Sequence, residues 1–168
     1  MQIAGQIVSV IAMALVVLSF QMKSNKMLLV VQMLANFLFA VSYFLLGVYT
    51  ASIVNLIAML RSLALYFWAD KHSNLLLIPT LIAFIFACIF TYAGVPTILV
   101  LVASIVDSFS MWKNDGKFIR YARLFAVSPL WLVHNIIRFS LGGLICEIFS
   151  IISCIIAFIR YKKEGFTK

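Results

Sequence analysis

The feature that most constrains this chain is a series of long apolar segments that recurs from one end to the other. Each is about 18 to 25 residues long, the length that an α-helix needs to cross roughly 30 Å of hydrocarbon. Hydrophobic residues occupy 65% of the 168 positions and charged residues only 11%. A soluble domain of this length needs far more polar surface. The sequence therefore predicts an all-α protein that crosses a membrane several times.

Seven of these segments are expected to span the membrane. Short loops separate them, and the stretch with Gly94 and Pro96 interrupts any helix after the fourth. The first segment lacks a basic leader and a small-residue cleavage site, which favours a retained helix over a signal peptide. The expected spans are residues 3–20, 27–46, 51–68, 75–92, 97–112, 121–139 and 144–159, and Pro129 can kink the sixth.

The positions of the basic residues predict an orientation. In the seven-span arrangement, eleven of the thirteen Lys and Arg residues fall on one side, and the loops of the other side have none. Those eleven are Lys23, Lys26, Lys71, Lys113, Lys117, Arg120, Arg123, Arg160, Lys162, Lys163 and Lys168. Because basic loops remain in the cytoplasm, we expect the N-terminus outside and the C-terminus inside.

This charge distribution also bears on partners. A net charge of +8 would suggest nucleic acid in a soluble protein, but here the cations follow the loops. The expected partners are therefore the lipid bilayer and a small polar solute, not nucleic acid. A homodimer is left open.

The spans group into two similar halves. Each half reads as span, basic loop, span, short glycine-containing turn and span, and Gly47 corresponds to Gly142 or Gly143 about 95 residues later. Residue identity between the halves is poor, so the repeat is one of topology and hydropathy. We expect parallel three-helix bundles at residues 1–70 and 95–161, a linker helix at 71–94 and a basic cytoplasmic tail at 162–168.

Two pairs of charged residues are expected inside the membrane, where an ionisable group usually has a partner. Arg61 and Asp107 each lie about ten residues past the outer start of their spans, or about 15 Å deep. This matched depth predicts an ion pair between the halves, either a fixed bridge or one that opens or binds a proton or substrate. Arg138 and Glu147 flank the Gly142–Gly143 turn and are the second expected pair. Arg138 can alternatively extend to the outer interface.

Uncharged polar residues converge on the same outer region. Asn36, Asn55, His134 and Asn135 lie within spans, and Trp131 and Tyr43 could supply flat apolar faces beside them. Singly, such amides most often link neighbouring helices by hydrogen bonds. Together they form a candidate substrate-binding site of Asn36, Asn55, Trp131, His134 and Asn135.

Motifs for enzyme chemistry are absent from the sequence. It contains no HExxH, no GxSxG, no closely paired carboxylates and no P-loop. Its three cysteines fit no metal-binding spacing. We therefore expect no enzyme activity, no cofactor, and no catalytic or metal-binding residues.

Two stretches resemble a known family: "VQMLANFLFAVSYFLLGVYTASIVNLIAMLRS" and "SPLWLVHNIIRFSLGGLICEIFSIISCIIAFIRY". Together they resemble the YgjV-type bacterial inner-membrane protein family over nearly the whole chain. The resemblance rests on Asn36, Gly47, Asn55, Arg61, Pro129, Trp131, Asn135, Glu147 and Arg160. It implies a multi-pass protein of the bacterial inner (plasma) membrane.

The three-one-three plan also resembles sugar facilitators of the SWEET and PQ-loop type. Asn55 is a loose counterpart of their third-helix asparagine, although the Pro-Gln dipeptide is missing. Trp131 and Asn135 are similar to part of the aromatic–amide motif of nicotinamide riboside transporters. These resemblances imply a secondary transporter or facilitator of a small, sugar- or vitamin-like metabolite. The alternative is a non-transporting scaffold, receptor or assembly factor whose buried charges are structural.

Overall fold

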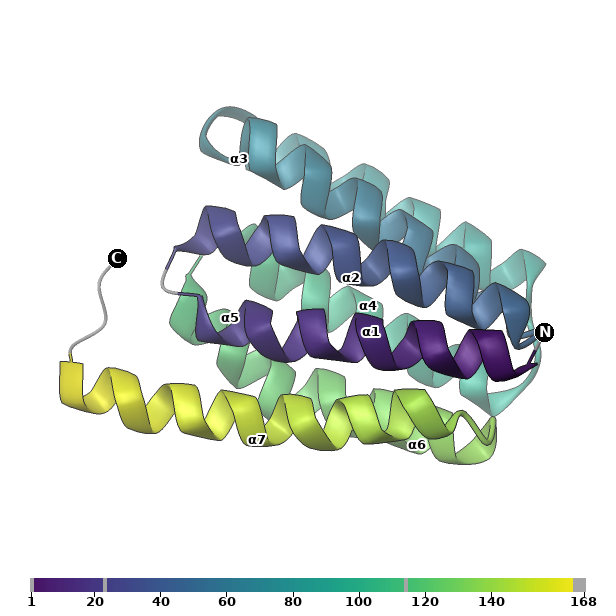
Figure 1. Cartoon of the computed structure of the whole chain (residues 1–168). Coiled ribbons are helices and arrows are strands. Elements are labelled where there is room, and N and C mark those ends of the chain that lie inside the picture. Colours follow the sequence, from purple (N-terminus) through teal and green to yellow (C-terminus); the bar gives the residue numbers. More distant parts are fainter. Residues whose placement is uncertain (1, 23, 114, 165–168) are drawn as a thin grey trace.

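The computed structural model describes residues 2–22, 24–113 and 115–164, with the backbone alone at residues 25, 69–74 and 161–164. Every regular element in these residues is helical, which confirms the all-α prediction (Figure 1). The elements are α1 (Gln2–Gln21), α2 (Asn25–Leu45), α3 (Tyr49–Phe90), α4 (Val95–Trp112), α5 (Gly116–Ala122), the π-helical η1 (Arg123–Val127), α6 (Ser128–Ile137) and α7 (Leu141–Glu164).

Helix α3 folds back on itself. A straight helix of its 42 residues would be about 63 Å long. Instead, the Thr50 hydroxyl donates a hydrogen bond of 2.6 Å to the Thr91 carbonyl just past the other end. Val54 packs in one cluster with Phe84 and Cys88. The first arm (residues 49–68) and the second arm (residues 75–90) therefore run antiparallel, where the third and fourth spans are expected (Figure 1).

The sixth expected span is an interrupted helical column, formed by α5, η1 and α6. It begins at Gly116, before the predicted start at Tyr121. In η1 the Ser128 N–H donates to the Arg123 carbonyl, five residues earlier. Pro129 follows directly and has no N–H to continue the ordinary ladder. The shifted hydrogen bonding changes the direction in which residues before Pro129 face.

The helices long enough to cross a membrane can be identified by length and hydropathy. Within the described residues there are five: Gln2–Gln21, Lys26–Leu45, Tyr49–Trp68, Val95–Trp112 and Leu141–Arg160. Leu75–Phe90 is apolar but shorter, and η1 divides the α5–α6 column.

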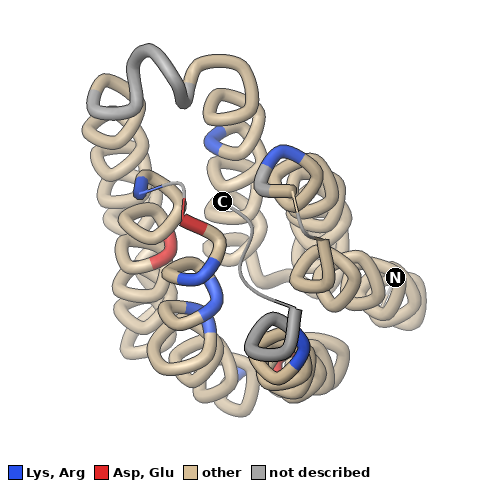
Figure 2. Tube along the Cα trace, turned by 90° about the vertical axis from the view of Figure 1, so that its left-hand side faces the viewer, with Lys and Arg blue, Asp and Glu red and all other residues tan. Residues whose placement is uncertain are grey.

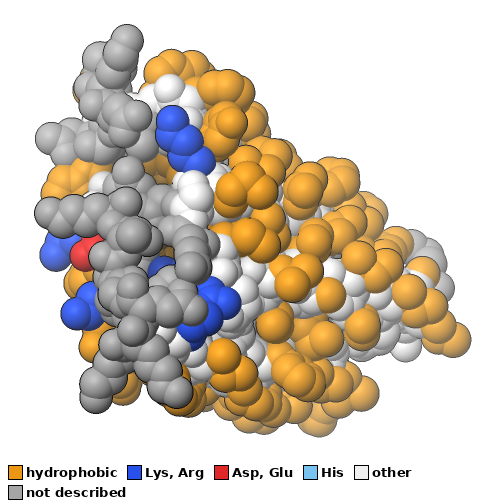
Figure 3. Space-filling model, turned by 60° about the vertical axis from the view of Figure 1, so that its left-hand side comes forward, with side chains coloured by type: hydrophobic (Ala, Val, Ile, Leu, Met, Phe, Trp, Pro, Cys, Tyr) orange, Lys and Arg blue, Asp and Glu red, His pale blue; other side chains and the backbone are white. Residues whose placement is uncertain are grey.

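Charge and apolar surface are segregated along the bundle. We call the end at which α1 and α7 finish the basic end, and Figure 2 looks onto it. The described cationic side chains there are Lys26, Lys113, Lys117, Arg120 and Arg160. Exposed apolar side chains cover the flank beyond them (Figure 3). Lys23 and Lys168 lie outside the described residues, as do the side chains of Lys71, Lys162 and Lys163.

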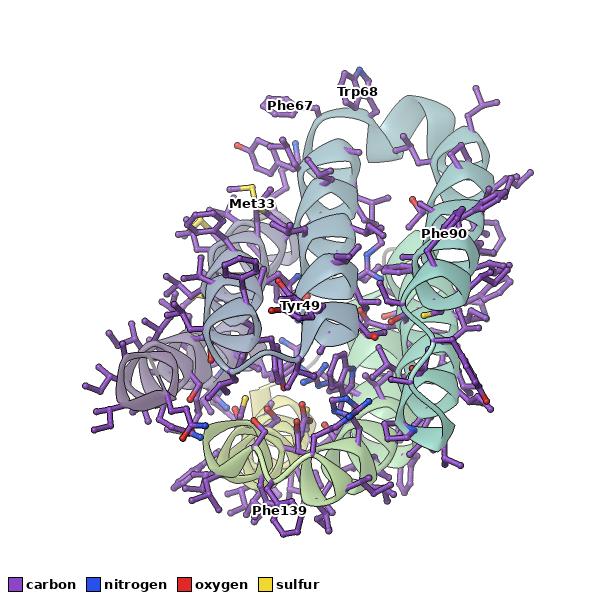
Figure 4. The ribbon with its side chains drawn as sticks, turned by 90° about the vertical axis from the view of Figure 1, so that its right-hand side faces the viewer. Met33, Tyr49, Phe67, Trp68, Phe90 and Phe139 are labelled. Atoms are coloured by element: carbon purple, nitrogen blue, oxygen red, sulfur yellow. The ribbon has the colours of Figure 1, made fainter. Side chains whose placement is uncertain are left out.

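The helices form a closed ring in chain order. Helix α1 packs on α2, α2 on α3, α3 on α4, α4 on α6 and α6 on α7, while α7 returns to α1 (Figure 4). Among the described residues, α1 and α3 make no comparable contact. Each half is therefore a curved row. In the first half, α2 lies between α1 and α3 and directs Phe39 and Tyr43 toward the interior of the ring.

Two equivalent turns show how the halves correspond. After α2, the Val48 N–H donates to the Tyr43 carbonyl at 2.9 Å, with Gly47 left-handed at φ +76°. After α6, the matching bond is 3.0 Å and Phe139 takes the left-handed position at φ +52°. Both follow the Schellman pattern of helix ends.

Corresponding residues of the two turns are 92 positions apart in the sequence, as are the two carbonyl acceptors, Tyr43 and Asn135. The expected counterparts of Gly47, namely Gly142 or Gly143, are therefore wrong. Applied to whole helices, the same shift takes α2 onto the α5–α6 column and the first arm of α3 onto α7.

The left-handed turns generate a stability prediction. Phe139 is 87% exposed, so its side chain gains little from burial, while its backbone conformation costs about 1–2 kcal/mol. We expect Phe139→Asn to raise the free energy of unfolding by about 1 kcal/mol, because asparagine tolerates this conformation. We expect Gly47→Ala to lower it by about 1 kcal/mol, although a Cβ at Gly47 would meet nothing within 4 Å.

Equilibrium unfolding of the purified protein in detergent measures both effects. Phe90→Asn is the matched control, because Phe90 is 82% exposed but helical and should give no gain. A loss of stability in Phe139→Asn would show that the aromatic ring outweighs the backbone strain.

Candidate functional site

A cavity lies inside the ring. Its volume is about 50 Å³, room for a few water-sized molecules. Every helical column contributes to its wall, from Val16 of α1 to Glu147 of α7. Its charged and amide or hydroxyl side chains include Gln32, Asn36, Asn55, Arg61, Ser104, Asp107, Arg123 and Glu147.

The first ion pair joins the first arm of α3 to α4. Arg61 Nη2 lies 2.5 Å from Asp107 Oδ2, and Arg61 Nη1 donates to Ser108 Oγ at 2.8 Å. The guanidinium also lies 6.0 Å from the centre of the Phe84 ring, at the limit of a cation–π contact. The predicted Arg61–Asp107 pair is therefore present, at the depth that the helix starts indicate.

The second ion pair differs from the expectation. Arg123 Nη2 contacts both carboxylate oxygens of Glu147, at 2.9 and 3.1 Å. The expected Arg138–Glu147 pair is wrong: Arg138 follows the end of α6 and donates to the Ala93 carbonyl at 3.2 Å. Arg123 belongs to η1, and it faces the cavity instead of joining the basic end.

An aromatic–amide cluster borders the cavity at the end opposite the basic end. The Tyr43 hydroxyl donates to Asn135 Oδ1 at 3.0 Å, and His134 Nδ1 lies 3.3 Å from the same oxygen. The Tyr43 and Trp131 rings stack with 6.1 Å between their centres. A Cβ at Gly143 would lie 2.6 Å from Asn135 Oδ1, so the glycine allows this close approach. The cluster links α2, α6 and α7.

The predicted solute-binding residues do not all reach the cavity. Asn36, Asn55 and Trp131 line it. His134 and Asn135 are each 1% exposed, are not among its lining residues, and support Tyr43. They lie behind Tyr43, not on the cavity wall, and their contact with a solute stays a prediction.

Sequence reasoning missed several lining residues. Gln32 precedes Asn36 by one helical turn, a spacing that puts both on one face of α2 and could have revealed it. Arg123 was counted with the basic loops, and no sequence signal marks the π-helical segment that turns it inward. Gly143 was expected only in a turn.

Several buried donors around the cavity lack an acceptor among the described residues. They are Arg61 Nε, Arg123 Nε and Asn135 Nδ2. Buried donors are normally bonded, so these N–H groups favour an interior occupied by polar molecules over a dry core. Among the described residues, no three His, Cys, Asp or Glu side chains come together as a metal site.

The basic end of the ring is tightly closed. Arg120 donates to the Phe20 carbonyl at 3.0 and 3.1 Å and to the Met22 carbonyl at 2.8 Å. Arg160 donates to the Gln21 carbonyl at 2.8 Å. Together these arginines satisfy carbonyl groups at the end of α1 that have no partner within the helix.

A second, smaller cavity of about 10 Å³, room for one water-sized molecule, lies between the arms of α3 and α4. Its lining includes Leu65, Leu76 and Trp112, which lie nearer the basic end. Arg61 lines both cavities. The Arg61–Asp107 pair thus stands at the boundary between them.

Comparison with known proteins identifies the family. Residues 3–165 match the Imp-YgjV family, described as a bacterial inner membrane protein. The chain belongs to this family. Its apolar flanks are therefore the surface that meets the inner membrane, as the sequence predicts. No curated protein and no solved structure matches the chain.

The revised ion pairing of this Imp-YgjV protein gives a direct test. Removing one partner of a buried pair costs about 3–5 kcal/mol, because the other charge is left uncompensated. We expect Arg123→Gln to lower the free energy of unfolding by about 3–5 kcal/mol. We expect Arg138→Gln to lower it by about 1 kcal/mol or less. Unfolding of the purified variants in detergent compares them. Equal losses, or a larger loss in Arg138→Gln, would contradict the Arg123–Glu147 assignment.

Proposed function

We propose that this protein is a secondary transporter or facilitator that carries a small polar metabolite across the inner membrane and catalyses no reaction. The main support is the position of Arg61, which lines both the central cavity and the smaller cavity nearer the basic end. A solute passing from one cavity to the other would have to pass the Arg61–Asp107 pair.

The proposed topology has seven crossings, with the basic end in the cytoplasm. Helix α1 begins at one end of the bundle and α7 finishes at the other, as an odd number of crossings requires (Figure 1). The two crossings beyond the five long helices are the second arm of α3, about 24 Å long, and the α5–α6 column, about 33 Å long. The excess of cations at the basic end favours the cytoplasmic side.

The proposed moving parts are two three-helix units related by the shift of 92 residues. One contains α1, α2 and the first arm of α3, the other contains α4, the α5–α6 column and α7, and the second arm of α3 links them. This arrangement supports the SWEET-like three-one-three plan in topology, although each unit is a curved row.

The units meet along two seams, and the Tyr43–Asn135 hydrogen bond also joins them across the ring, so it too must yield when they move. At the α1–α7 seam, the Gly142 N–H donates to Gln6 Oε1 at 3.1 Å near one end, and Gln21 donates to Ser153 Oγ at 2.7 Å near the other. At the seam of the first arm with α4, the Arg61–Asp107 pair is the main polar bridge between the described side chains. We propose that the units rock about the α1–α7 seam while the ion pair breaks and re-forms.

The rival function is a non-transporting scaffold, receptor or assembly factor. It is favoured by one observation: each of the four cavity charges already has a partner of opposite sign. Replacing a buried pair with apolar residues is often neutral or stabilising. Both functions are therefore compatible with a double variant, Arg61→Leu/Asp107→Leu, that still folds. Only the rival function predicts that this variant keeps its cellular activity.

A ligand screen tests the transporter proposal. Purified protein would be heated with sugars, nucleosides, vitamins and amino acids, and unfolding recorded. A ligand at about 100 times its dissociation constant adds about 2.7 kcal/mol to the free energy of unfolding. We expect one class to raise Tm in the unaltered protein but not in Asp107→Asn, because that change removes a charge from the cavity wall.

Asp115→Asn is the matched control. It makes the same chemical change at the start of α5, where Asp115 accepts from the Lys117 N–H and asparagine caps equally well. The control should keep the ligand-induced shift. Flux of the same ligand into proteoliposomes then separates transport from binding. A panel without any shift would favour the scaffold function.

A further inference from the structure

The four charges of the cavity are unequally open to it. In the first pair, the Arg61 side chain is 3% exposed and that of Asp107 is 17% exposed. In the second pair, Arg123 is 15% exposed and Glu147 is 7% exposed. Each pair therefore has a covered partner and an open partner, and the open partners, Asp107 and Arg123, have opposite signs.

These open charges lie on neighbouring walls without neutralising each other. Asp107 belongs to α4 and Arg123 to η1, and these two elements pack directly. Among the described residues, Asp107 is paired with Arg61 and Arg123 with Glu147, and no ion pair joins Asp107 to Arg123. A solute in the cavity would thus meet one anionic and one cationic group on two neighbouring elements.

Each open charge also has unused hydrogen-bonding capacity. Asp107 accepts from Arg61 through Oδ2, which leaves Oδ1 for another donor. Arg123 donates to Glu147 through Nη2 alone, so its Nη1 group remains for an acceptor in the cavity, while its Nε is buried. Asn55 donates to its own helix at Ala51, so its Oδ1 adds a second acceptor to the wall.

We infer that the cavity takes a small zwitterion, a solute with one ammonium and one carboxylate group as in an α-amino acid, oriented by Asp107 and Arg123. The inference rests on the proposed function only in assuming that a solute enters this cavity. The ammonium group binds Asp107 Oδ1 and Asn55 Oδ1, and the carboxylate binds the free Nη1 group of Arg123. Trp131 and Phe39 offer apolar surface to the rest of the solute.

Other charge classes fit the cavity less well. A simple anion bound at Arg123 would be repelled by the carboxylate of Asp107, and a simple cation bound at Asp107 would be repelled by the guanidinium of Arg123. Neither carries a second charge to offset this repulsion in a site of low dielectric. A neutral polyol would displace polar molecules from Asp107 and Arg123. It has no charged group, so it could not form the stronger hydrogen bonds that join two charged groups. A zwitterion is the class that compensates both.

A series of ligand derivatives tests the inference on the unaltered protein. The binding of the standard L-amino acids to the full chain in detergent would be measured by calorimetry. The tightest would be compared with its amide, which lacks the carboxylate, and its N-acetyl form, which lacks the ammonium. We expect each derivative to bind at least tenfold more weakly, because each loses one charge-assisted contact.

Variants then assign the two charges. In Asp107→Asn we expect the N-acetyl form to bind within about threefold of the parent amino acid, while the amide keeps its tenfold deficit. In the control Asp115→Asn, the amide and the N-acetyl form should both still bind at least tenfold more weakly than the parent amino acid. If Asp107→Asn does not fold, the derivative series still decides the question.

The outcomes separate this inference from the transporter proposal. Binding of a sugar or nucleoside but of no amino acid would overturn the zwitterion and leave transport standing. Derivatives that bind as tightly as the parent would also overturn it. Zwitterion binding without flux in proteoliposomes would support the inference and overturn transport. No ligand in any class would overturn both.

Discussion

A charged side chain in hydrocarbon is tolerated only beside an opposite charge or a polar molecule, and four such side chains lie inside this ring of helices. Arg61 binds Asp107 across the contact of α3 with α4, and Arg123 binds Glu147 across that of η1 with α7. Each pairing fixes the rotation of two helices about their axes. The apolar faces then turn outward, and the long charged side chains keep the interior from packing as a dry core.

The cavity follows from this constraint and brings the polar residues of the chain together. The resemblance to the Imp-YgjV family rests partly on residues that line the cavity: Asn36, Asn55, Arg61, Trp131 and Glu147. Asn135 accepts a hydrogen bond from Tyr43 of the cavity wall, and Arg160 holds the end of α1.

The sequence was informative where a single physical quantity decides the structure. Apolar length located the helices within a few residues, because the thickness of hydrocarbon sets it. Depth along a regular helix predicted the Arg61–Asp107 pair. Prediction failed where the backbone departs from the regular helix. The π-helical turn before Pro129 moved Arg123 inward, so Glu147 found a partner other than Arg138.

Other differences between the expected and the observed structure have several causes. Phe139 adopts a left-handed conformation that normally signals glycine, so the correspondence of the two halves was sought at Gly142 or Gly143. The curved-row packing depends on which faces of α1 and α3 meet α2, and hydropathy does not specify this. Asn135 and His134 were expected to contact the solute because helical spacing places a residue on one face of a helix. Spacing does not show that another side chain, here Tyr43, lies between that face and the cavity.

The arginine contacts at the end of α1 also bear on how the protein is made. Arg160 lies 139 residues after Gln21, whose carbonyl it binds, and Arg120 lies 100 residues after Phe20. During synthesis the first helix enters the bilayer long before either arginine has been translated. Contacts so distant in sequence form late. Closure of the ring is therefore the last step of assembly, and a chain that stops short of α7 leaves its first helix without a permanent neighbour on one side.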